Sequence, residues 1–196
     1  MGAPAGRDAV NELHLRFLAS DEWAGYLATE LAPWIDTFDL GDALMEIGPG
    51  PGRTTDLLRE RVASVTAVEL DTELAAALAE RLDGTNVTVL SRSAADTGLD
   101  AASFSSVACF TMLHHVPTAE EQDRLFAEAA RVLRPGGVLI AVDSVDSEEL
   151  RAGHVDDVFN PVDPAALEAR LVQAGFTGVS IDTSHRQMRF SATTPV

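Results

Sequence analysis

The chain has 196 residues, 46% of them hydrophobic, and a formal net charge of −17. This length and composition predict a globular protein with one sizeable core, and the acidic charge argues against nucleic acid or an anionic membrane surface as a partner. No apolar run is long enough to span a bilayer, the first residues lack the apolar core of a signal peptide, and the single Cys109 excludes an internal disulfide, so we expect a cytoplasmic protein.

Helical periodicity covers residues 8–33, with a break near Ser20. We expect two helices here and disorder over residues 1–7. No linker or repeat interrupts the chain, so residues 1–196 are expected to form a single domain, with a helical segment at 1–40 and the core at 41–196.

The stretch Ala43–Gly52 reads Ala-Leu-Met-Glu-Ile-Gly-Pro-Gly-Pro-Gly. Its apolar start predicts a buried strand, and its glycines and prolines predict a turn before a helix. Because proline carries no N–H, we expect the donors for a ligand at this turn to be Gly48, Gly50 and Gly52. The helix should begin near Arg53, where its N-terminus favours an anionic group.

The register of this turn is Glu-x-Gly-x-Gly-x-Gly from Glu46 to Gly52, whereas the dinucleotide fingerprint would place its third glycine at Arg53. It resembles the cofactor loop of class I S-adenosylmethionine-dependent methyltransferases, which opens with an acidic residue two positions before the first glycine. The resemblance covers residues 44–190 and implies S-adenosylmethionine as the cofactor, with S-adenosylhomocysteine as the product. The loop residues that it implies in cofactor binding are Glu46, Gly48, Pro49, Gly50 and Gly52.

The segment Ser64–Leu70 predicts the second strand, followed by Asp71 as the N-cap of a helix at Thr72–Leu82. Glu69 stands at the end of that strand, where an acidic side chain can accept both ribose hydroxyls of a nucleotide. We expect Leu70 to lie against the adenine face. The resemblance further implies that helices before the first strand cover the cofactor, with Trp23, Tyr26 and Trp34 as the candidates.

The third strand is predicted at Asn86–Leu90. After it the resembled family often carries Gly-Asp-Ala, whose aspartate takes the adenine amino group. In this chain the matching positions are Ser93 and Ala94, so a charge-assisted contact is lost. Asp96 follows three residues later as a possible substitute.

The apolar segment Phe104–Phe110 predicts a central strand that continues into Thr-Met-Leu-His-His. Ligands of open α/β sheets bind outside the carboxyl ends of the strands. The resemblance therefore implies that Phe110 and Thr111 hold the methionine part of the cofactor, and that the side chains of His114 and His115 lie just beyond it, near the methyl group.

A capping box at Thr118 and Glu121 predicts an amphipathic helix that ends before Arg134-Pro-Gly-Gly. A fifth strand at Gly137–Asp143 follows, and residues 144–162 are expected to form a loop. The last predicted elements are a helix and an antiparallel hairpin, at 163–175, Thr177–Asp182 and Gln187–Ala192.

A base is needed only if the acceptor must lose a proton near neutral pH, and histidine suits that task. The candidates are His114 and His115, with Asp143 second because it ends a strand on the same edge. His154 and the aspartates at 156–157 are too few and too mixed a ligand set to assign a metal, so no metal site is predicted.

Together these elements predict an α/β, Rossmann-like doubly wound sheet of seven mostly parallel strands, with an antiparallel C-terminal edge hairpin and N-terminal cover helices. The resemblance implies methyl transfer to an unidentified small molecule through an oxygen, nitrogen or carbon atom. One alternative is an NAD(P)-dependent oxidoreductase, against which Arg53 and the lack of lysine speak. The other is a non-catalytic cofactor-binding protein, suggested by Ser93.

Overall fold

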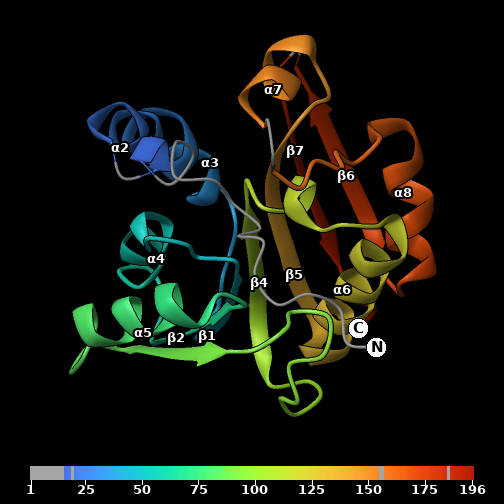
Figure 1. The fold of residues 1–196 in the computed structure, drawn as a ribbon. Helices are drawn as coiled ribbons and strands as arrows, with labels where there is room; N and C mark the ends of the chain where they lie inside the picture. The colour runs from blue at the N-terminus through green and yellow to red at the C-terminus, as the bar shows by residue number, and fades with distance from the viewer. Residues whose placement is uncertain (1–15, 19, 155–156, 185) are drawn as a thin grey trace, which may run out of the picture.

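The computed structural model describes residues 16–18, 20–154, 157–184 and 186–196 (Figure 1). The disorder expected for residues 1–7 concerns residues outside these ranges, and so does Asp156, which was considered as a metal ligand. His14 and His185, to which the sequence assigns no functional role, also lie outside them.

Seven strands form one mixed sheet in the order β3-β2-β1-β4-β5-β7-β6. The strands are β1 (Ala43–Ile47), β2 (Ser64–Glu69), β3 (Val87–Ser91), β4 (Phe104–Phe110), β5 (Leu133–Ser144), β6 (Thr177–Thr183) and β7 (Gln187–Thr193). The first five run parallel, whereas β7 pairs antiparallel with both β5 and β6. The predicted fold class is confirmed. The strand order reverses between β1 and β4, the switch point at which such sheets bind ligands.

Side-chain caps define most of the helices. The helices are α2 (Asp21–Tyr26), α3 (Ala32–Ile35), α4 (Arg53–Leu58), α5 (Thr72–Arg81), α6 (Ala119–Val132), α7 (Glu148–Gly153) and α8 (Pro164–Gln173), with a π-helical turn η1 (Leu27–Leu31) and a 3-10 turn η2 (Leu113–His115). Five helices begin after a side chain that accepts a backbone N–H of the first turn, namely Ser20, Asp71, Thr118, Ser147 and Asp163. Each cap satisfies donors that the helix itself leaves unpaired.

Helices cover both faces of the sheet (Figure 1). On one face α6 and α8 pack on β1, β4, β5 and β7 through a cluster that includes Met45, Val107, Phe126, Leu139, Leu167 and Phe190. On the other face η1, α3 and α4 pack on β1, β4 and β5 through Leu31, Ile35, Leu44, Leu58 and Ile140. The N-terminal helices are therefore part of the layer that shields the sheet, because their apolar side chains bury it.

Two sequence-based boundaries were wrong. Residues 144–162 are not all loop, since they contain α7, which Ser147 caps and which begins with Glu148 and Glu149. This helix was missed because it is short and has no buried face. Strand β5 begins at Leu133 rather than Gly137, because Leu133 pairs with Phe104 across an irregularity in the ladder.

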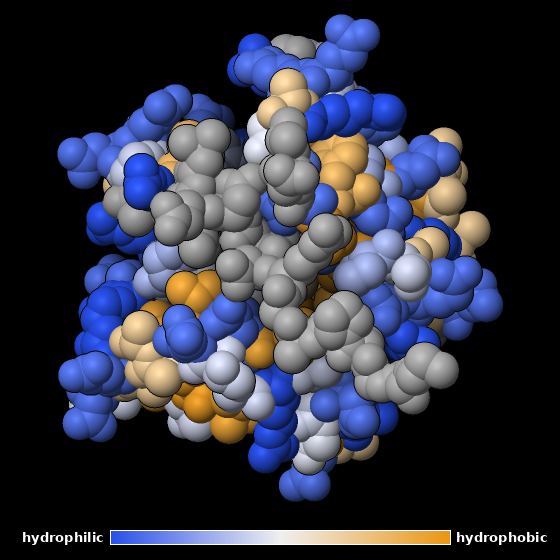
Figure 2. Space-filling model, in the orientation of Figure 1, coloured by the Kyte–Doolittle hydropathy of each residue, from blue (hydrophilic) through white to orange (hydrophobic). Residues whose placement is uncertain are grey.

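On the face drawn in Figure 2, hydrophilic side chains cover most of the periphery and hydrophobic ones form small patches. Among the described residues, no helix combines the length and the apolar character that crossing a bilayer requires.

Candidate active site

The glycine loop between β1 and α4 adopts a conformation that only glycine takes without strain. The backbone φ is +64° at Gly48, +52° at Gly50 and +83° at Gly52. A Cβ atom at Gly52 would lie 2.3 Å from Leu78 Cδ1, whereas one at Gly50 would meet only Leu18 Cδ1 at 4.0 Å. Gly52 is thus required by packing as well as by φ, and Gly50 leaves open space beside the loop.

The amides of this loop are bonded within the protein, contrary to the expectation that all three face a ligand. Gly48 N–H donates to the Val68 carbonyl and Gly52 N–H to the Pro49 carbonyl, each at 2.9 Å. Gly50 N–H donates to Glu69 Oε2 at 3.0 Å. The prolines and the tight turn direct these donors inward, so the loop offers a ligand its shape and the carboxylate of Glu69.

Glu46 lies beneath the loop and is 1% exposed. Its carboxylate accepts hydrogen bonds from Thr54 Oγ1 at 2.5 Å and from Thr55 Oγ1 at 2.6 Å, both in the first turn of α4. Burial raises its pKa from 4.5 to about 7, against the lowering effect of the two hydroxyls. Glu46 therefore ties α4 to β1, and among the described residues it is not one that lines the adjacent cavity.

Glu69 closes the end of β2 beside the loop. Its second oxygen, Oε1, accepts the backbone N–H of Asp71 at 3.0 Å. Burial raises the pKa of Glu69, and these backbone hydrogen bonds oppose the rise. The neighbouring Leu70 is 67% exposed, which presents an apolar side chain at the cavity.

A cavity of about 1260 Å³ opens at the carboxyl ends of β1, β2 and β4. Of the residues predicted to bind the cofactor, those that line it are Gly48, Pro49, Gly50, Glu69, Leu70, Ser93, Ala94, Phe110 and Thr111. Glu46 and Gly52 lie behind this wall. Carboxylates and guanidinium groups line it as well, and the sequence had not marked most of them: Asp71, Glu73, Glu121, Arg53, Arg92 and Arg124.

The wall after β3 departs from the family pattern in its chemistry and not in its position. Ser93 Oγ accepts the backbone N–H of Ala95 at 3.2 Å, as in a tight turn. Asp96, the possible substitute for the missing aspartate, lines the same part of the cavity as Ser93 and Ala94. Both a hydroxyl and a carboxylate are therefore present at this wall.

Thr111 carries backbone strain at the end of β4. Its φ is +53°, a value rarely adopted by a β-branched residue, and its N–H donates to the Val142 carbonyl at 2.7 Å. Strained residues of this kind cluster at functional sites because the surrounding structure must hold them in place. Thr111 lies between the glycine loop and the histidines that follow.

The three candidate catalytic side chains divide into two positions. His115 lines the cavity. His114 is 1% exposed and its Nδ1 lies 2.5 Å from Oδ1 of the fully buried Asp143 on β5. Because a carboxylate only accepts, Nδ1–H of His114 is the donor of this bond, and the pair stands behind His115.

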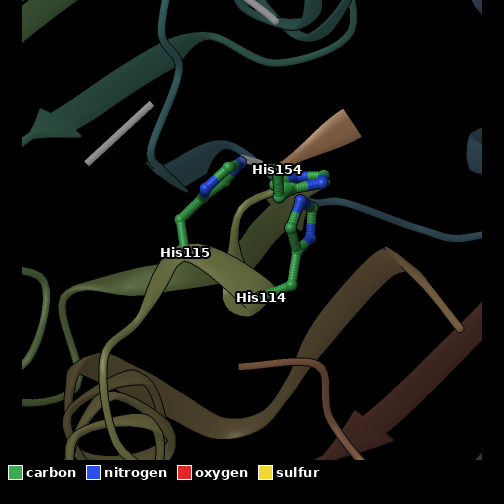
Figure 3. Close-up of side chains that lie close together, drawn as sticks. All are labelled: His114, His115 and His154. Carbon is green, nitrogen blue, oxygen red and sulfur yellow. The ribbon is translucent and has the colours of Figure 1, made fainter. Parts of the chain in front are cut away.

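His154, to which the sequence gave too few partners, joins these histidines at the end of α7 (Figure 3). The ring centroid of His154 lies 5.0 Å from that of His114 and 5.2 Å from that of His115. The segment that follows α7 is bonded to η2, since Asn160 N–H donates to the His114 carbonyl at 2.7 Å. The signal available in the sequence was the group of His154, the aspartates at 156–157 and Asn160, but nothing local indicates which strand end it approaches.

The proposed cover residues also separate. Trp23 lines the cavity. Tyr26 donates its hydroxyl hydrogen bond to Gln187 Oε1 at 3.1 Å, and the guanidinium of Arg189 lies 6.0 Å from the ring centroid of Trp34. These two side chains therefore join the N-terminal helices to β7.

Comparison with known proteins follows this geometry. The sequence profile of a family described as "Methyltransferase domain" matches residues 45–141, from β1 into β5. Among characterised relatives, the ubiquinone biosynthesis O-methyltransferase of Psychrobacter arcticus is 26% identical over an alignment of 206 positions. This alignment covers 94% of this chain and 78% of that protein.

Solved structures share the fold. A protein of Pyrococcus horikoshii matches with a TM-score of 0.77 at 15% identity, covering 91% of this chain and 94% of that one. Phosphoethanolamine N-methyltransferase 2 of Haemonchus contortus, in complex with phosphomonomethylethanolamine and S-adenosylhomocysteine, matches with a TM-score of 0.73 at 17% identity. That match covers 89% of this chain and 53% of the worm enzyme, so the chain spans about half of its length.

Proposed function

The chain is a class I S-adenosylmethionine-dependent methyltransferase, and from this premise we propose that its acceptor is a small molecule methylated on oxygen, nitrogen or carbon. The methyltransferase profile and relatives favour this assignment over a nicotinamide-dependent oxidoreductase and over a non-catalytic cofactor-binding protein. The Psychrobacter relative, named as an O-methyltransferase, supports an oxygen nucleophile among the three.

The size and extent of the cavity carry this proposal. Pockets for a single small ligand reach about 1,000 Å³. The cavity here is about 1260 Å³ and runs from the glycine loop to His115, Glu121 and Arg124. Its walls thus provide room for a cofactor at one end and for a small acceptor at the other.

Two features of the cofactor end support S-adenosylmethionine as its ligand. Glu69 provides the acidic acceptor for ribose hydroxyls, and Gly50 leaves open space beside it. When bound, the cofactor supplies an electrophilic methyl group on a sulfonium. The contribution of the chain is alignment of the two reactants, which is worth about 7–11 kcal/mol when the geometry is good.

The histidine end can take up a proton from an acceptor whose nucleophile must ionise. His115 lines the cavity there and is 6% exposed. His114 and Asp143 act as positioning residues, because their bond orients the ring of His114, whose centroid lies 4.2 Å from that of His115. An imidazole in this place suits an acceptor hydroxyl near neutral pH.

Calorimetric titration with S-adenosylhomocysteine, beside NAD and NADP in the same buffer, tests the cofactor. We expect micromolar affinity for S-adenosylhomocysteine alone, and loss of that affinity in Gly50→Leu, because the new side chain enters the cavity. Gly25→Leu is the matched control, since Gly25 is on the exposed side of α2 with nothing near its Cβ position. Binding of a nicotinamide nucleotide instead would overturn the assignment.

The acceptor is then sought by following S-adenosylhomocysteine formation against panels of phenols, amines and carbon acids, and against tRNA as the nucleic-acid comparison. We expect turnover with a small molecule and none with tRNA. Turnover with tRNA alone would overturn the proposed acceptor class.

A further inference from the structure

We propose that His114, His115 and His154 bind a divalent transition-metal ion of the Zn²⁺ type, with one coordination position turned toward the cavity. One ligand nitrogen from each ring lies within 4.8 Å of the others, and all three side chains are buried. Figure 3 shows the two rings of η2 converging with the ring of His154. Nitrogens around a tetrahedral Zn²⁺ are about 3.4 Å apart, so binding would draw these nitrogens together from separations of up to 4.8 Å.

An oxygen atom lies near Nδ1 of each of the three imidazoles. Asp143 Oδ1 is 2.5 Å from Nδ1 of His114, and the Leu150 carbonyl oxygen is 2.7 Å from Nδ1 of His154. Asp157 Oδ1 lies 3.6 Å from Nδ1 of His115, beyond hydrogen-bond distance, so its carboxylate is a nearby charge and not a hydrogen-bond acceptor of that ring. His114 and His154 each place Nδ1 within hydrogen-bond distance of an oxygen. A histidine that donates its Nδ1–H to such an oxygen carries its lone pair on Nε2, which is the arrangement around metal-bound histidines.

The donor set selects the class of ion. Three neutral imidazoles suit Zn²⁺, Co²⁺ or Ni²⁺, whereas Mg²⁺ and Ca²⁺ require mostly oxygen ligands. The carboxylates of Asp143 and Asp157 offset the charge of a dication in this buried place. Three protein ligands leave the fourth tetrahedral position open, which is typical of catalytic rather than structural zinc sites.

Hydrogen bonds hold the two ligand-bearing segments together. Asn160 Nδ2 donates to the Val116 carbonyl at 3.0 Å, in addition to the bond from its backbone N–H to His114. Gln122, buried on α6, donates from Nε2 to the carbonyls of Leu113 at 3.0 Å and Asn160 at 2.8 Å. The cluster therefore rests on a supported framework, which precise metal sites require.

The location of the site suggests its role, and this step rests on the proposed function. His115 lines the cavity, so the open position faces the end where the acceptor binds. An acceptor that carries a hydroxyl or enol oxygen would occupy it, and coordination would lower the pKa of that hydroxyl. Its proton passes to water, and the oxygen then forms the new bond to the methyl carbon as the bond from that carbon to sulfur breaks. In this state His115 is a metal ligand and not the base.

The first experiment titrates Co²⁺ into the full chain, prepared without a histidine tag and treated with a chelator. We expect one saturable equivalent with the visible absorption of tetrahedral nitrogen-ligated Co²⁺, displaced by Zn²⁺. A wild-type protein that shows no such spectrum would overturn the proposal. This readout needs no variant, cofactor or acceptor.

Variants locate the ion. Asp143→Asn should lower the affinity for Zn²⁺ by about 10–100-fold, as loss of a hydrogen bond to a metal ligand does, and His154→Gln should lower it further. Glu149→Gln is the matched control, because it removes an exposed carboxylate from helix α7, which ends directly before His154, and should leave the affinity unchanged. Equal affinity in all of these proteins would place the ion elsewhere and overturn the assignment, and circular dichroism confirms that each variant is folded.

Two further readouts separate this inference from the proposed function. Acetohydroxamate, a bidentate oxygen ligand, should change the Co²⁺ spectrum; an unchanged spectrum would mean a closed site and overturn the role in acceptor binding. Calorimetry with S-adenosylhomocysteine is run on the same samples. Co²⁺ binding without S-adenosylhomocysteine binding would support the metal site and refute the proposed function. S-adenosylhomocysteine binding without Co²⁺ binding would support the proposed function and refute the metal site.

Discussion

Backbone groups dominate one end of the cavity, and side chains dominate the other. The cofactor end is built around backbone, namely the glycine loop with its positive φ values and the carboxylate of Glu69, which accepts the amides of Gly50 and Asp71. At the histidine end His115 of η2 lines the cavity, and the buried side chains of His114, of Asp143 on β5 and of His154, which follows α7, lie close to it. A backbone wall recognises shape and tolerates changes in neighbouring side chains, whereas a cluster of ionisable side chains depends on each partner. Stability and binding at the two ends should therefore respond to mutation differently.

Removing Asp143 should have the largest effect on stability. In Asp143→Ala the buried Nδ1–H of His114 loses its acceptor, and we expect the free energy of unfolding in urea to fall by about 3–5 kcal/mol. Asp146→Ala is the control, because Asp146 pairs with Arg151 at the surface and should contribute at most about 1 kcal/mol. Similar losses in the two variants would contradict the distinction between buried and exposed partners.

The glycine loop offers a comparison within one turn. We expect Gly52→Ala to lose about 2–4 kcal/mol of stability, since its Cβ meets both strain and Leu78. Gly50→Ala should lose only about 1–2 kcal/mol, from strain alone, while weakening S-adenosylhomocysteine binding because its Cβ enters the cavity wall. Urea unfolding and calorimetry on both variants measure these effects. Equal stabilities would refute the packing role of Gly52.

The raised pKa of Glu46 makes the free energy of unfolding depend on pH. Its native pKa is about 7 against 4.5 unperturbed, so the native state binds more protons than the unfolded state between these values. The free energy of unfolding should fall by about 3 kcal/mol from this residue as pH rises from 4.5 to 7, and then level off. Glu46→Gln should remove that fall. A wild-type and a variant whose stabilities differ by the same amount at pH 5 and pH 8 would contradict it.

The smallest effect on stability is expected at Thr111, between the cofactor end and the histidine end of the cavity. Thr111→Gly relieves a positive φ and should raise stability by about 1 kcal/mol, the strain relieved being partly offset by glycine entropy. Ala102→Gly is the matched control, because Ala102 has the same φ of 53° and does not line the cavity. We expect both to gain stability and only Thr111→Gly to lose affinity for S-adenosylhomocysteine. Unchanged affinity in both would show that the strain has no part in binding.

Much of the fold follows from local patterns in the chain. The apolar runs of β1, β2 and β4, the caps at Asp71 and Thr118, and the edge hairpin were all predicted close to their observed positions. These signals depend on a few adjacent residues and on side-chain period, which is why they survive without tertiary information. The start of β5 and helix α7 were missed, because sheet pairing extends the first and no apolar face marks the second.

The sequence by itself determined the glycine loop and the family resemblance, because the turn requires glycine at set positions and the acidic residue stands at a set spacing. It also placed Glu69, since a residue at a strand end needs only the strand to be located. Only the tertiary structure decided that Glu46 lies beneath the loop, that His115 lines the cavity while His114 bonds to Asp143, and that His154 joins them. Those contacts connect segments far apart in the chain, so they depend on the order of strands and on the path of the chain after β5, which no local pattern encodes.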